Sequence, residues 1–421
     1  MGINKKVLII VYDFPPNIGG GRVMRTVKFA KYLPEFGWEP IVLTVKRYDY
    51  YMKDSSLLKE LKGTKIYYAF DPIFSHIRAW RDFLFKKAKT KIFPSVGIRK
   101  NSFVSQLIKN HLGWYLPALI YGIYICLANR IKVIYSTSPP HTPHLVALSL
   151  HNLLGIPWVC DFRDAWADNP IYEFSEFIFL KKIAFFFEKC VIKSAKHIIC
   201  STKAISNGFE KRYASSNISI IYNGYDEDDF KDLKGMKFNK FTIVYVGGIG
   251  AKRSLSPILR ALENLEVYVL KQIQLLLIGK VAEDTLFDIE NSNVRNVVNI
   301  IPYIQHKKVL EYIVTGDVLL VVLMPDEDGM RAIPAKVFEY LRAGKPILAV
   351  CSKMSELWIL VSSFEGNICV EPYDADGIKI AIKSLFMYKS NVLFNQERVR
   401  KFERKEGTHI LAGIFSQNDN N

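Results

Sequence analysis

The chain of 421 residues carries a formal net charge of +16. Its residues are 49% apolar and 23% charged, and these fractions exclude an intrinsically disordered protein. This length exceeds one ordinary hydrophobic core and predicts two domains. The six cysteines stand singly, with no Cys-x-x-Cys pair. This argues against a zinc site and a disulfide framework, and favours a cytoplasmic protein with reduced thiols.

The first half of the chain alternates apolar runs with helical patterns. The run at residues 7–12 predicts a buried strand, because it is too short for a signal-peptide core and meets Asp13 at once. The loop DFPPNIGGG follows it and leads into a helix from about residue 22. Further strands are expected at residues 40–45, 132–135, 156–160 and 197–200, with helices at 142–154 and about 177–196.

A basic segment interrupts this pattern. Residues 78–100 hold eight basic side chains and one acid, Asp82, interleaved with large aromatic rings. This mixture suits an anionic membrane surface, although a solvated helical face has the same composition. We expect no span, because the apolar stretch 114–128 falls short of the ~20 residues that cross a bilayer. Without a zinc finger, RNA-recognition signature or basic coiled coil, nucleic acid is not an expected partner.

The second half repeats the alternation of strands and helices. The two halves together predict an α/β fold of two doubly wound parallel sheets. The expected limits are residues 1–225 for the first domain, 226–240 for a polar linker, 241–390 for the second domain and 391–421 for a C-terminal helix with a polar tail. Strands are expected in this half at residues 241–247, 273–279, about 299–304, 317–323 and from 345 on.

Two glycine-rich loops follow predicted strands, where ligands of open parallel sheets gather. Gly19, Gly20 and Gly21 leave the backbone free to approach a phosphate or sugar, although a tight turn would also need them. In the second half, Gly248 lies just before Lys252 and Arg253, and cations beside such a loop suit a diphosphate. Two surface cations are the alternative.

The segment IPAKVFEYLRAGKPIL predicts a helix that opens at Pro334, with Lys336 in its first turn and Glu339 one turn on. A carboxylate there can accept hydrogen bonds from both hydroxyls of a ribose. The alternative is a surface glutamate paired with Lys336 or Arg342. Two residues at strand ends complete the predicted donor-binding set, Gly279 and Tyr303.

The segment DFRDAWADNP follows the strand at 156–160 and places Asp161, Arg163 and Asp164 close together. We interpret these as candidate catalytic residues, because carboxylates can orient an acceptor hydroxyl and arginine can bind phosphate. An internal Asp–Arg brace is the alternative, and the two roles are compatible. Trp166 in the same segment and His141 in SPPHTPH are candidates for the acceptor side, although such a histidine is as often structural.

Taken in order, these loops resemble the GT-B fold and family 4 of the retaining glycosyltransferases, with IPAKVFEYLRAGKPIL the most specific stretch. Glu339 matches the second of that family's two glutamates, whereas Arg331 stands where the first is expected. Arg163 stands where the family commonly has a histidine. These departures resemble a subgroup with SPP and DFRD motifs, typical of surface-polysaccharide and lipid-linked glycan synthesis.

The resemblance implies two Rossmann-like domains facing across a cleft, with the first on the acceptor side and the C-terminal helix packed back on it. It also implies retaining transfer from a nucleotide-diphosphate sugar to a glycan or lipid-linked acceptor, with no metal and no further cofactor. The enzyme would be cytoplasmic and peripheral at the inner face of the membrane. A sugar-nucleotide 2-epimerase, which shares the fold, and a non-catalytic partner in a polysaccharide assembly complex are the alternatives, and Arg331 favours the latter.

Overall fold

The chain divides into two compact units, each with its own parallel sheet. The first unit comprises residues 1–222 and 405–421, and the second comprises residues 223–404. The computed structural model describes residues 5–16, 21–46, 56–61, 63–72, 111–168, 178–215, 217–250, 253–388 and 396–419. Gly19, Gly20, Lys252 and the basic segment 78–100 therefore lie outside the described residues.

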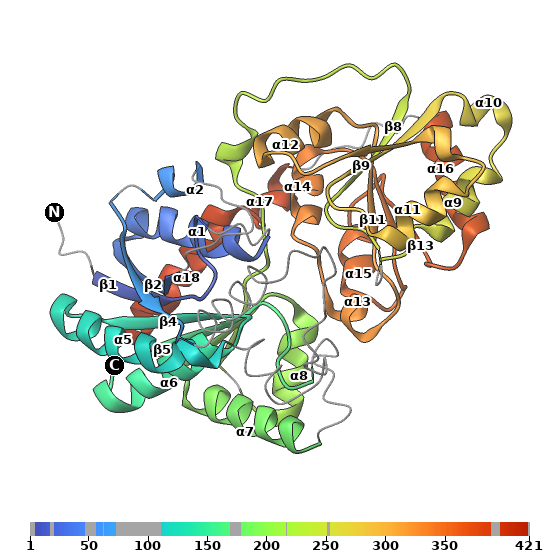
Figure 1. The fold of residues 1–421 in the computed structure, drawn as a ribbon. Helices are drawn as coiled ribbons and strands as arrows, with labels where there is room; N and C mark the ends of the chain where they lie inside the picture. Colours follow the sequence, from blue (N-terminus) through green and yellow to red (C-terminus); the bar gives the residue numbers. More distant parts are fainter. Residues whose placement is uncertain are drawn as a thin grey trace, which may run out of the picture. The chain divides into compact units, whose positions relative to one another are not determined.

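The first unit contains a seven-stranded parallel sheet of order β3-β2-β1-β4-β5-β6-β7 (Figure 1). The chain enters at the middle of the sheet, builds one side and then crosses to build the other, as in doubly wound folds. Its strands are β1 (Lys5–Ile10), β2 (Trp38–Lys46), β3 (Lys65–Phe70), β4 (Val133–Ser138), β5 (Trp158–Phe162), β6 (His197–Cys200) and β7 (Ile218–Ile220).

Alternate side chains of these strands belong to two separate hydrophobic cores, because successive residues of a strand point to opposite faces of the sheet. Ile9 belongs to the core under α1 (Gly21–Tyr32) and α18 (Arg404–Asp419), whereas Ile10 belongs to the core on the other face. The last helix is fixed there by Phe415, whose ring lies 5.3 Å from that of Trp38. The other face is covered by α5 (Tyr115–Asn129), α6 (Thr142–Leu154), α7 (Ile178–Ser194) and α8 (Lys203–Tyr213).

The second unit repeats this topology with six parallel strands in the order β10-β9-β8-β11-β12-β13. The prediction of two parallel-sheet α/β domains is therefore confirmed. The strands are β8 (Phe241–Val246), β9 (Ile273–Ile278), β10 (Val298–Ile301), β11 (Val318–Val322), β12 (Ile347–Val350) and β13 (Ile368–Val370). The helices are α9 (Ser256–Glu263), α10 (Val267–Leu270), α11 (Glu283–Glu290), α12 (His306–Thr315), α13 (Glu327–Arg331), α14 (Lys336–Ala343), α15 (Glu356–Ser362), α16 (Ala375–Tyr388) and α17 (Gln396–Arg400).

The polar stretch 226–240 lies within the second unit and is anchored there. It contains the short helix η3 (Glu227–Phe230), and the Arg342 guanidinium donates hydrogen bonds to both oxygens of Glu227, with 2.6 Å for the bond from Nε. The Arg342 guanidinium also lies 5.0 Å from the Phe230 ring. Arg342 is thus used in holding this stretch to α14 and not in pairing with Glu339.

Candidate functional site

The turns after β8 and β9 in the second unit each contain a glycine that could not be replaced by a residue with a side chain. Gly250 has φ +129°, and a Cβ there would lie 2.2 Å from the Cβ of Ala282. Gly279 has φ +131°, and a Cβ there would lie 2.7 Å from the carbonyl oxygen of Gly247. The glycines thus let the ends of β8 and β9 approach each other closely, and Gly248, whose Cβ position lies no nearer than 3.9 Å to other atoms, is left open.

Arg253 and Lys336 meet at the loop after β8. The loop closes on Arg253, which exchanges backbone hydrogen bonds with Gly250, and Arg253 hydrogen-bonds the Tyr245 hydroxyl. Lys336 Nζ donates to the Val246 carbonyl at 2.7 Å and lies 3.5 Å from the centre of the Tyr245 ring. Among the described residues, neither cation forms an ion pair with a carboxylate.

The half-buried Lys336 side chain is electrostatically strained in the free protein. Its pKa is held well below the ordinary lysine value, first by removal from water and then by the like charge of Arg253. An anion bound between the two cations would relieve both effects, because it favours the charged form of each. The geometry therefore suits a doubly charged ligand such as a diphosphate.

Helix α14 is tied to the end of β8 by a second contact, from the Val246 amide to the Tyr340 hydroxyl at 3.1 Å. The helix begins at Lys336 and not at Pro334, whose carbonyl accepts the Val337 amide at 2.9 Å. The predicted donor residues Gly248, Gly279, Arg253 and Lys336 are thus gathered around the carboxyl ends of β8 and β9. The contacts described above do not include Tyr303, which is 52% exposed.

Glu339 lies one helical turn beyond Lys336, in contact with a residue that the sequence did not single out. His306, the first residue of α12, lies with Nε2 2.9 Å from Oε1 of Glu339. Among the described residues the second carboxylate oxygen makes no hydrogen bond, and the side chain is 20% exposed. Glu339 is therefore oriented by His306 and keeps an oxygen available to a ligand hydroxyl.

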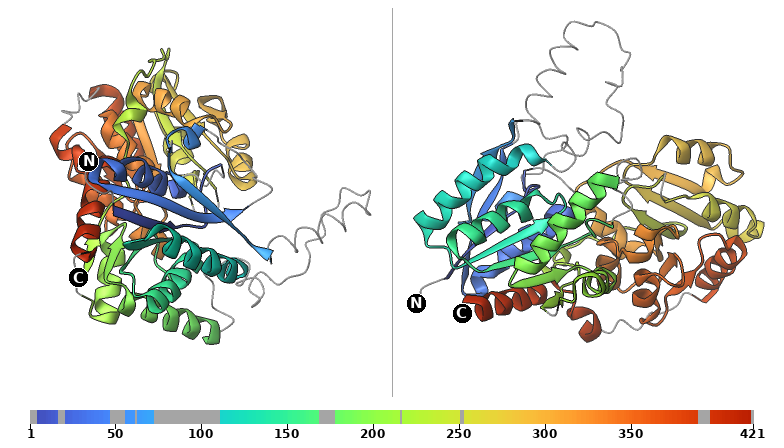
Figure 2. Two further views of the ribbon diagram at one scale, coloured as in Figure 1. Left: turned by 90° about the vertical axis from the view of Figure 1, so that its left-hand side faces the viewer. Right: turned by 90° about the horizontal axis from the view of Figure 1, so that it is seen from below.

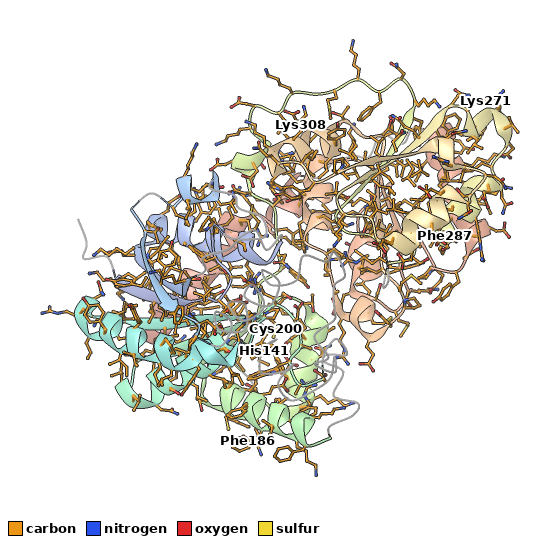
Figure 3. The ribbon with its side chains drawn as sticks, viewed as in Figure 1. His141, Phe186, Cys200, Lys271, Phe287 and Lys308 are labelled. Carbon is orange, nitrogen blue, oxygen red and sulfur yellow. The ribbon has the colours of Figure 1, made fainter. Side chains whose placement is uncertain are left out.

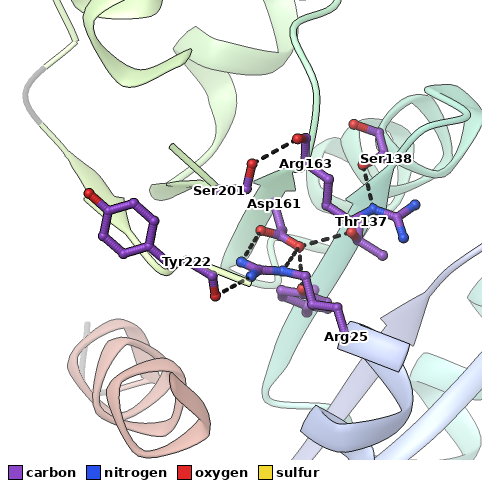
Figure 4. Close-up of polar contacts among 8 residues, drawn as sticks. Arg25, Thr137, Ser138, Asp161, Arg163, Ser201 and Tyr222 are labelled. Atoms are coloured by element: carbon purple, nitrogen blue, oxygen red, sulfur yellow. Dashed lines mark hydrogen bonds and ion pairs between the residues drawn. The ribbon is translucent and has the colours of Figure 1, made fainter. Parts of the chain in front are cut away.

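In the first unit, Asp161 lies in β5 and is completely buried (Figure 4). Its carboxylate accepts hydrogen bonds from Nε and Nη2 of Arg25 at 3.0 and 2.8 Å. Tyr135 and Thr137 of the neighbouring strand β4 donate to it at 2.7 and 2.9 Å. Burial alone would raise the pKa of Asp161, but the Arg25 charge and these hydrogen bonds hold it below its usual value.

The alternative interpretation is an internal brace between Asp161 and Arg163, but the hydrogen bonds of the two side chains go to different partners. The Arg163 guanidinium donates to the carbonyl oxygen of Ser138 at 2.8 Å (Figure 4). It also donates to the carbonyl oxygen of Pro139 at 2.6 Å. Arg163 thus fastens the segment after β5 to the SPP segment after β4, and the Ser201 hydroxyl bonds its carbonyl at 2.7 Å. Three strand ends are joined at this point.

Residues 163–168, which we call the β5 loop, are also anchored at their far end. The Ala167 amide donates to the buried Glu188 at 2.8 Å, and Arg212 bridges Glu188 and Asp168. Trp166 stacks on His141, with ring centres 4.4 Å apart and planes 7° from parallel. The pKa of His141 is lowered well below its ordinary value, chiefly by burial, so this ring is neutral at pH 7.

Asp164, between these anchors, is half-buried and differs from Asp161. Its carboxylate makes no hydrogen bond with the described residues. Of the three predicted catalytic residues, Asp161 and Arg163 therefore hold the end of β5 and its loop in place. Asp164 alone among the three has a carboxylate that is available to a substrate. Gly21, which the sequence placed in the donor-binding set, is the first residue of α1 in this unit.

Sequence reasoning missed Arg25, Glu188 and His306. A carboxylate inside the apolar strand β5 requires a buried cation, so a partner for Asp161 was foreseeable, although the sequence did not identify which one. Arg25 and Lys28 both lie on α1 among apolar neighbours and are both buried, with Lys28 bonded to Glu60. Long-range pairs such as Arg25–Asp161, 136 positions apart, leave no trace in local spacing.

The two sheets and their helices define the fold class as GT-B. No protein-family model matches the chain, and no curated protein matches its sequence. Solved structures of this fold do match. HepE of Anabaena in complex with UDP is 13% identical, with a TM-score of 0.66 over 98% of this chain and 100% of that one.

Two further structures extend this likeness. Sucrose-phosphate synthase from Thermosynechococcus elongatus is 14% identical, with a TM-score of 0.67 over 98% of each chain. WaaG, a glycosyltransferase involved in lipopolysaccharide biosynthesis, is 14% identical, with a TM-score of 0.55 over 97% of this chain and 95% of that one. At these identities the likeness shows the fold and leaves activity to be argued from the residues.

Proposed function

We propose that the protein is a glycosyltransferase that moves a sugar from a nucleotide-diphosphate sugar to a glycan or lipid-linked acceptor. The observation that carries this proposal is a pair of cations at the carboxyl end of β8, Lys336 and Arg253, which have no carboxylate partner in the described part of the chain. The HepE structure contains UDP, so one protein of this fold binds a nucleoside diphosphate.

On the donor side, the diphosphate would bind between Arg253 and Lys336, against the open backbone at Gly248. Negative charge grows on the diphosphate as the bond to the sugar breaks, and fixed cations stabilise that charge. We therefore propose transfer without a metal ion. Glu339, oriented by His306, would accept hydrogen bonds from the ribose hydroxyls, with Pro334, Gly279 and Tyr303 on the surface around the nucleotide.

On the acceptor side, we assign Asp164 the role of orienting the attacking hydroxyl. Its carboxylate is available and its loop is held at both ends, which fixes the side chain before the substrate binds. Asp161 and Arg163 act through the position of this loop. We assign the same indirect role on the acceptor side to the stacked rings of His141 and Trp166, because both are buried. Retention of the anomeric configuration by front-face attack is part of this proposal.

The acceptor class and the place of action are proposals as well. WaaG, which shares the fold, is a glycosyltransferase involved in lipopolysaccharide biosynthesis. Together with the basic aromatic segment 78–100, this supports a role in surface-polysaccharide synthesis at the cytoplasmic face of a membrane.

A screen of sugar nucleotides for thermal stabilisation identifies the donor, and product analysis then tests the reaction. The proposal requires release of nucleoside diphosphate that depends on an added acceptor. Conversion of the donor to an isomeric sugar nucleotide without acceptor would identify an epimerase. Tight donor binding without turnover of any acceptor would indicate a non-catalytic partner in an assembly complex. Arg331 favours this role, because it stands where the resembling family has its first glutamate.

A further inference from the structure

Helix α5 of the first unit contains no Asp, Glu, Lys or Arg. Its fifteen residues read YLPALIYGIYICLAN. With the preceding turn they form the stretch Leu112–Asn129, which has a mean hydropathy of 1.3 and is long and apolar enough to cross a membrane by composition alone. Only 28% of that stretch is buried within the protein.

One side of α5 belongs to the core of the first unit. Trp114 just before the helix is completely buried and donates from Nε1 to the Ala69 carbonyl at 3.2 Å. Gly122 allows α6 to approach closely, because a Cβ there would lie 2.7 Å from a methyl carbon of Leu150. The Tyr115 hydroxyl lies 2.7 Å from the Ser149 hydroxyl of α6. The helix is therefore a packed part of the sheet layer and lies along the surface.

The other side of α5 is an exposed apolar face. Leu116, Ile120 and Leu127 are 61%, 59% and 67% exposed, and Tyr121 and Tyr124 are 44% and 60% exposed. The spacing of Leu116, Ile120, Tyr124 and Leu127 places them in one row along about 16 Å of helix, at 1.5 Å per residue. A contiguous row of large exposed apolar side chains is typical of a surface that binds a protein or a membrane.

The neighbouring helices add further rings and positive charge to this face. The right-hand view of Figure 2 shows α5, α6 and α7 side by side over the sheet. Leu153 of α6 and Phe179 and Phe186 of α7 are 63%, 70% and 62% exposed, and Phe186 points away from the molecule (Figure 3). The exposed charged residues of α7 are all lysines: Lys181, Lys182, Lys189 and Lys193.

Within the three helices, no acidic side chain is exposed. The three helices contain a single acid, Glu188, which is buried and bonded by Tyr213 at 2.6 Å and by Arg212. We define the α5–α7 face as the exposed side chains of these helices. It is apolar along α5, and mixed aromatic and basic along α7.

We propose that the α5–α7 face docks onto an anionic lipid bilayer, with the apolar row of α5 inserted at the level of the headgroups. An apolar stripe bordered by lysines and aromatic rings is the pattern of helices that lie in the plane of a membrane interface. Tyrosine rings favour that boundary because one end is apolar and the other polar.

Charge complementarity selects the bilayer over a second copy of the chain. Two copies meeting through this face would bring lysines against lysines, in a protein whose net charge is already +16. A bilayer with anionic headgroups neutralises the same lysines while its acyl chains cover the α5 row. The proposal is independent of glycosyl transfer and concerns described residues outside the segment 78–100.

Flotation with vesicles of equal parts phosphatidylcholine and phosphatidylglycerol tests the proposal. We compare wild type with a variant carrying Leu116→Ser, Ile120→Ser and Leu127→Ser. The matched control carries Phe287→Ser, Ile359→Ser and Ile380→Ser, which are equally exposed in the second unit at 67%, 63% and 67%. We expect wild type and control to float and the α5 variant to lose binding by about tenfold or more.

The proposal is overturned if wild type fails to float, or if the α5 variant floats as well as the control. It is also overturned if wild type forms dimers in sedimentation and the α5 substitutions convert them to monomers, because the face would then join two copies. Should the α5 variant unfold at a lower temperature, the variant Lys181→Ser, Lys182→Ser and Lys189→Ser carries the test. It must bind anionic vesicles several-fold more weakly at low salt, and equal binding would contradict the proposal. Transfer to a soluble acceptor is measured separately, so either proposal can fail alone.

Discussion

The guanidinium of Arg25 and the carboxylate of Asp161 form a two-point ion pair in which both side chains are completely buried. It joins α1 to β5, and a further bond from Arg25 Nη1 to the Tyr222 carbonyl at 2.9 Å extends it to the end of the first unit's main segment. Because neither charge reaches water, removal of one partner leaves the other uncompensated in the core. The pair therefore governs the stability of the region that carries the β5 loop.

Replacing Asp161 by Asn should destabilise the protein. The substitution leaves the Arg25 charge buried without a counter-charge, at a cost of about 3–5 kcal/mol in the free energy of unfolding. Urea unfolding measures the change, with Asp164→Asn as the control, for which we expect less than about 1 kcal/mol. An Asp161→Asn variant as stable as wild type would show that the pair adds nothing to folding.

Acid should weaken the same pair. The folded-state pKa of Asp161 lies below its unfolded value, so its contribution is present above the unfolded pKa and is lost as the pH falls through the folded one. Stability should therefore decline below about pH 4. Thermal unfolding from pH 6 to pH 3 measures the decline, and the part due to Asp161 should be absent from the Asp161→Asn variant.

Replacing Asp164 by Asn should act on turnover instead. Its carboxylate has no bond with the described residues, so the fold does not depend on it. We expect turnover to fall by at least ~100-fold, with donor affinity and melting temperature close to wild type. Activity and melting temperature are measured on the same preparation. A stable and fully active variant would remove Asp164 from the site.

Replacing Glu339 by Ala should weaken binding of the nucleotide. Loss of a charged hydrogen bond costs about 1.5–3 kcal/mol, so the dissociation constant should rise by about 10-fold to 150-fold. Isothermal titration measures it, with Glu290→Ala as the control, because Glu290 is exposed and unpaired among the described residues of the same unit. Equal affinities for Glu339→Ala and wild type would show that the ribose contact is misassigned.

Binding of the diphosphate should be coupled to uptake of a proton by Lys336. Lys336 has a depressed pKa in the free protein, and a bound anion restores it toward the ordinary value. Proton uptake should therefore accompany binding above about pH 8, where the diphosphate is already fully ionised, and affinity should fall as the pH rises through the pKa of the complex. Titration in buffers of different ionisation enthalpy measures the uptake. It should vanish in Lys336→Met, and equal heats in all buffers for wild type would contradict the assignment.

The sequence predicted both sheets because their central strands are continuous apolar runs, such as β8 and β11. It missed β3, β7 and β13, which all lie at sheet edges. β7 and β13 are only three residues long, and most side chains of β3 and β7 are partly exposed. It also placed the end of the strand before Asp161 too early, because a buried aspartate looks like the start of a loop until its partner Arg25 is known.

For the candidate site, the sequence predicted where the loops lie but not what each side chain does. The topology brings the loops after parallel strands to one end of each sheet, so Gly248, Arg253 and Lys336 could be grouped from spacing alone. Whether a carboxylate in such a loop is buried or available depends on contacts made by distant segments. Asp161 and Asp164 stand three positions apart, and only the structure distinguishes them.

The most direct test of the central claim is acceptor-dependent release of nucleoside diphosphate from a sugar nucleotide that stabilises the protein. Wild type is compared with Lys336→Met, which removes the charge proposed to bind the diphosphate while leaving a side chain of similar length. The account predicts product formation by wild type and a loss of at least ~100-fold in the variant, because the departing charge is no longer neutralised. Equal turnover by both proteins, or failure of wild type to bind any nucleotide sugar, would contradict it.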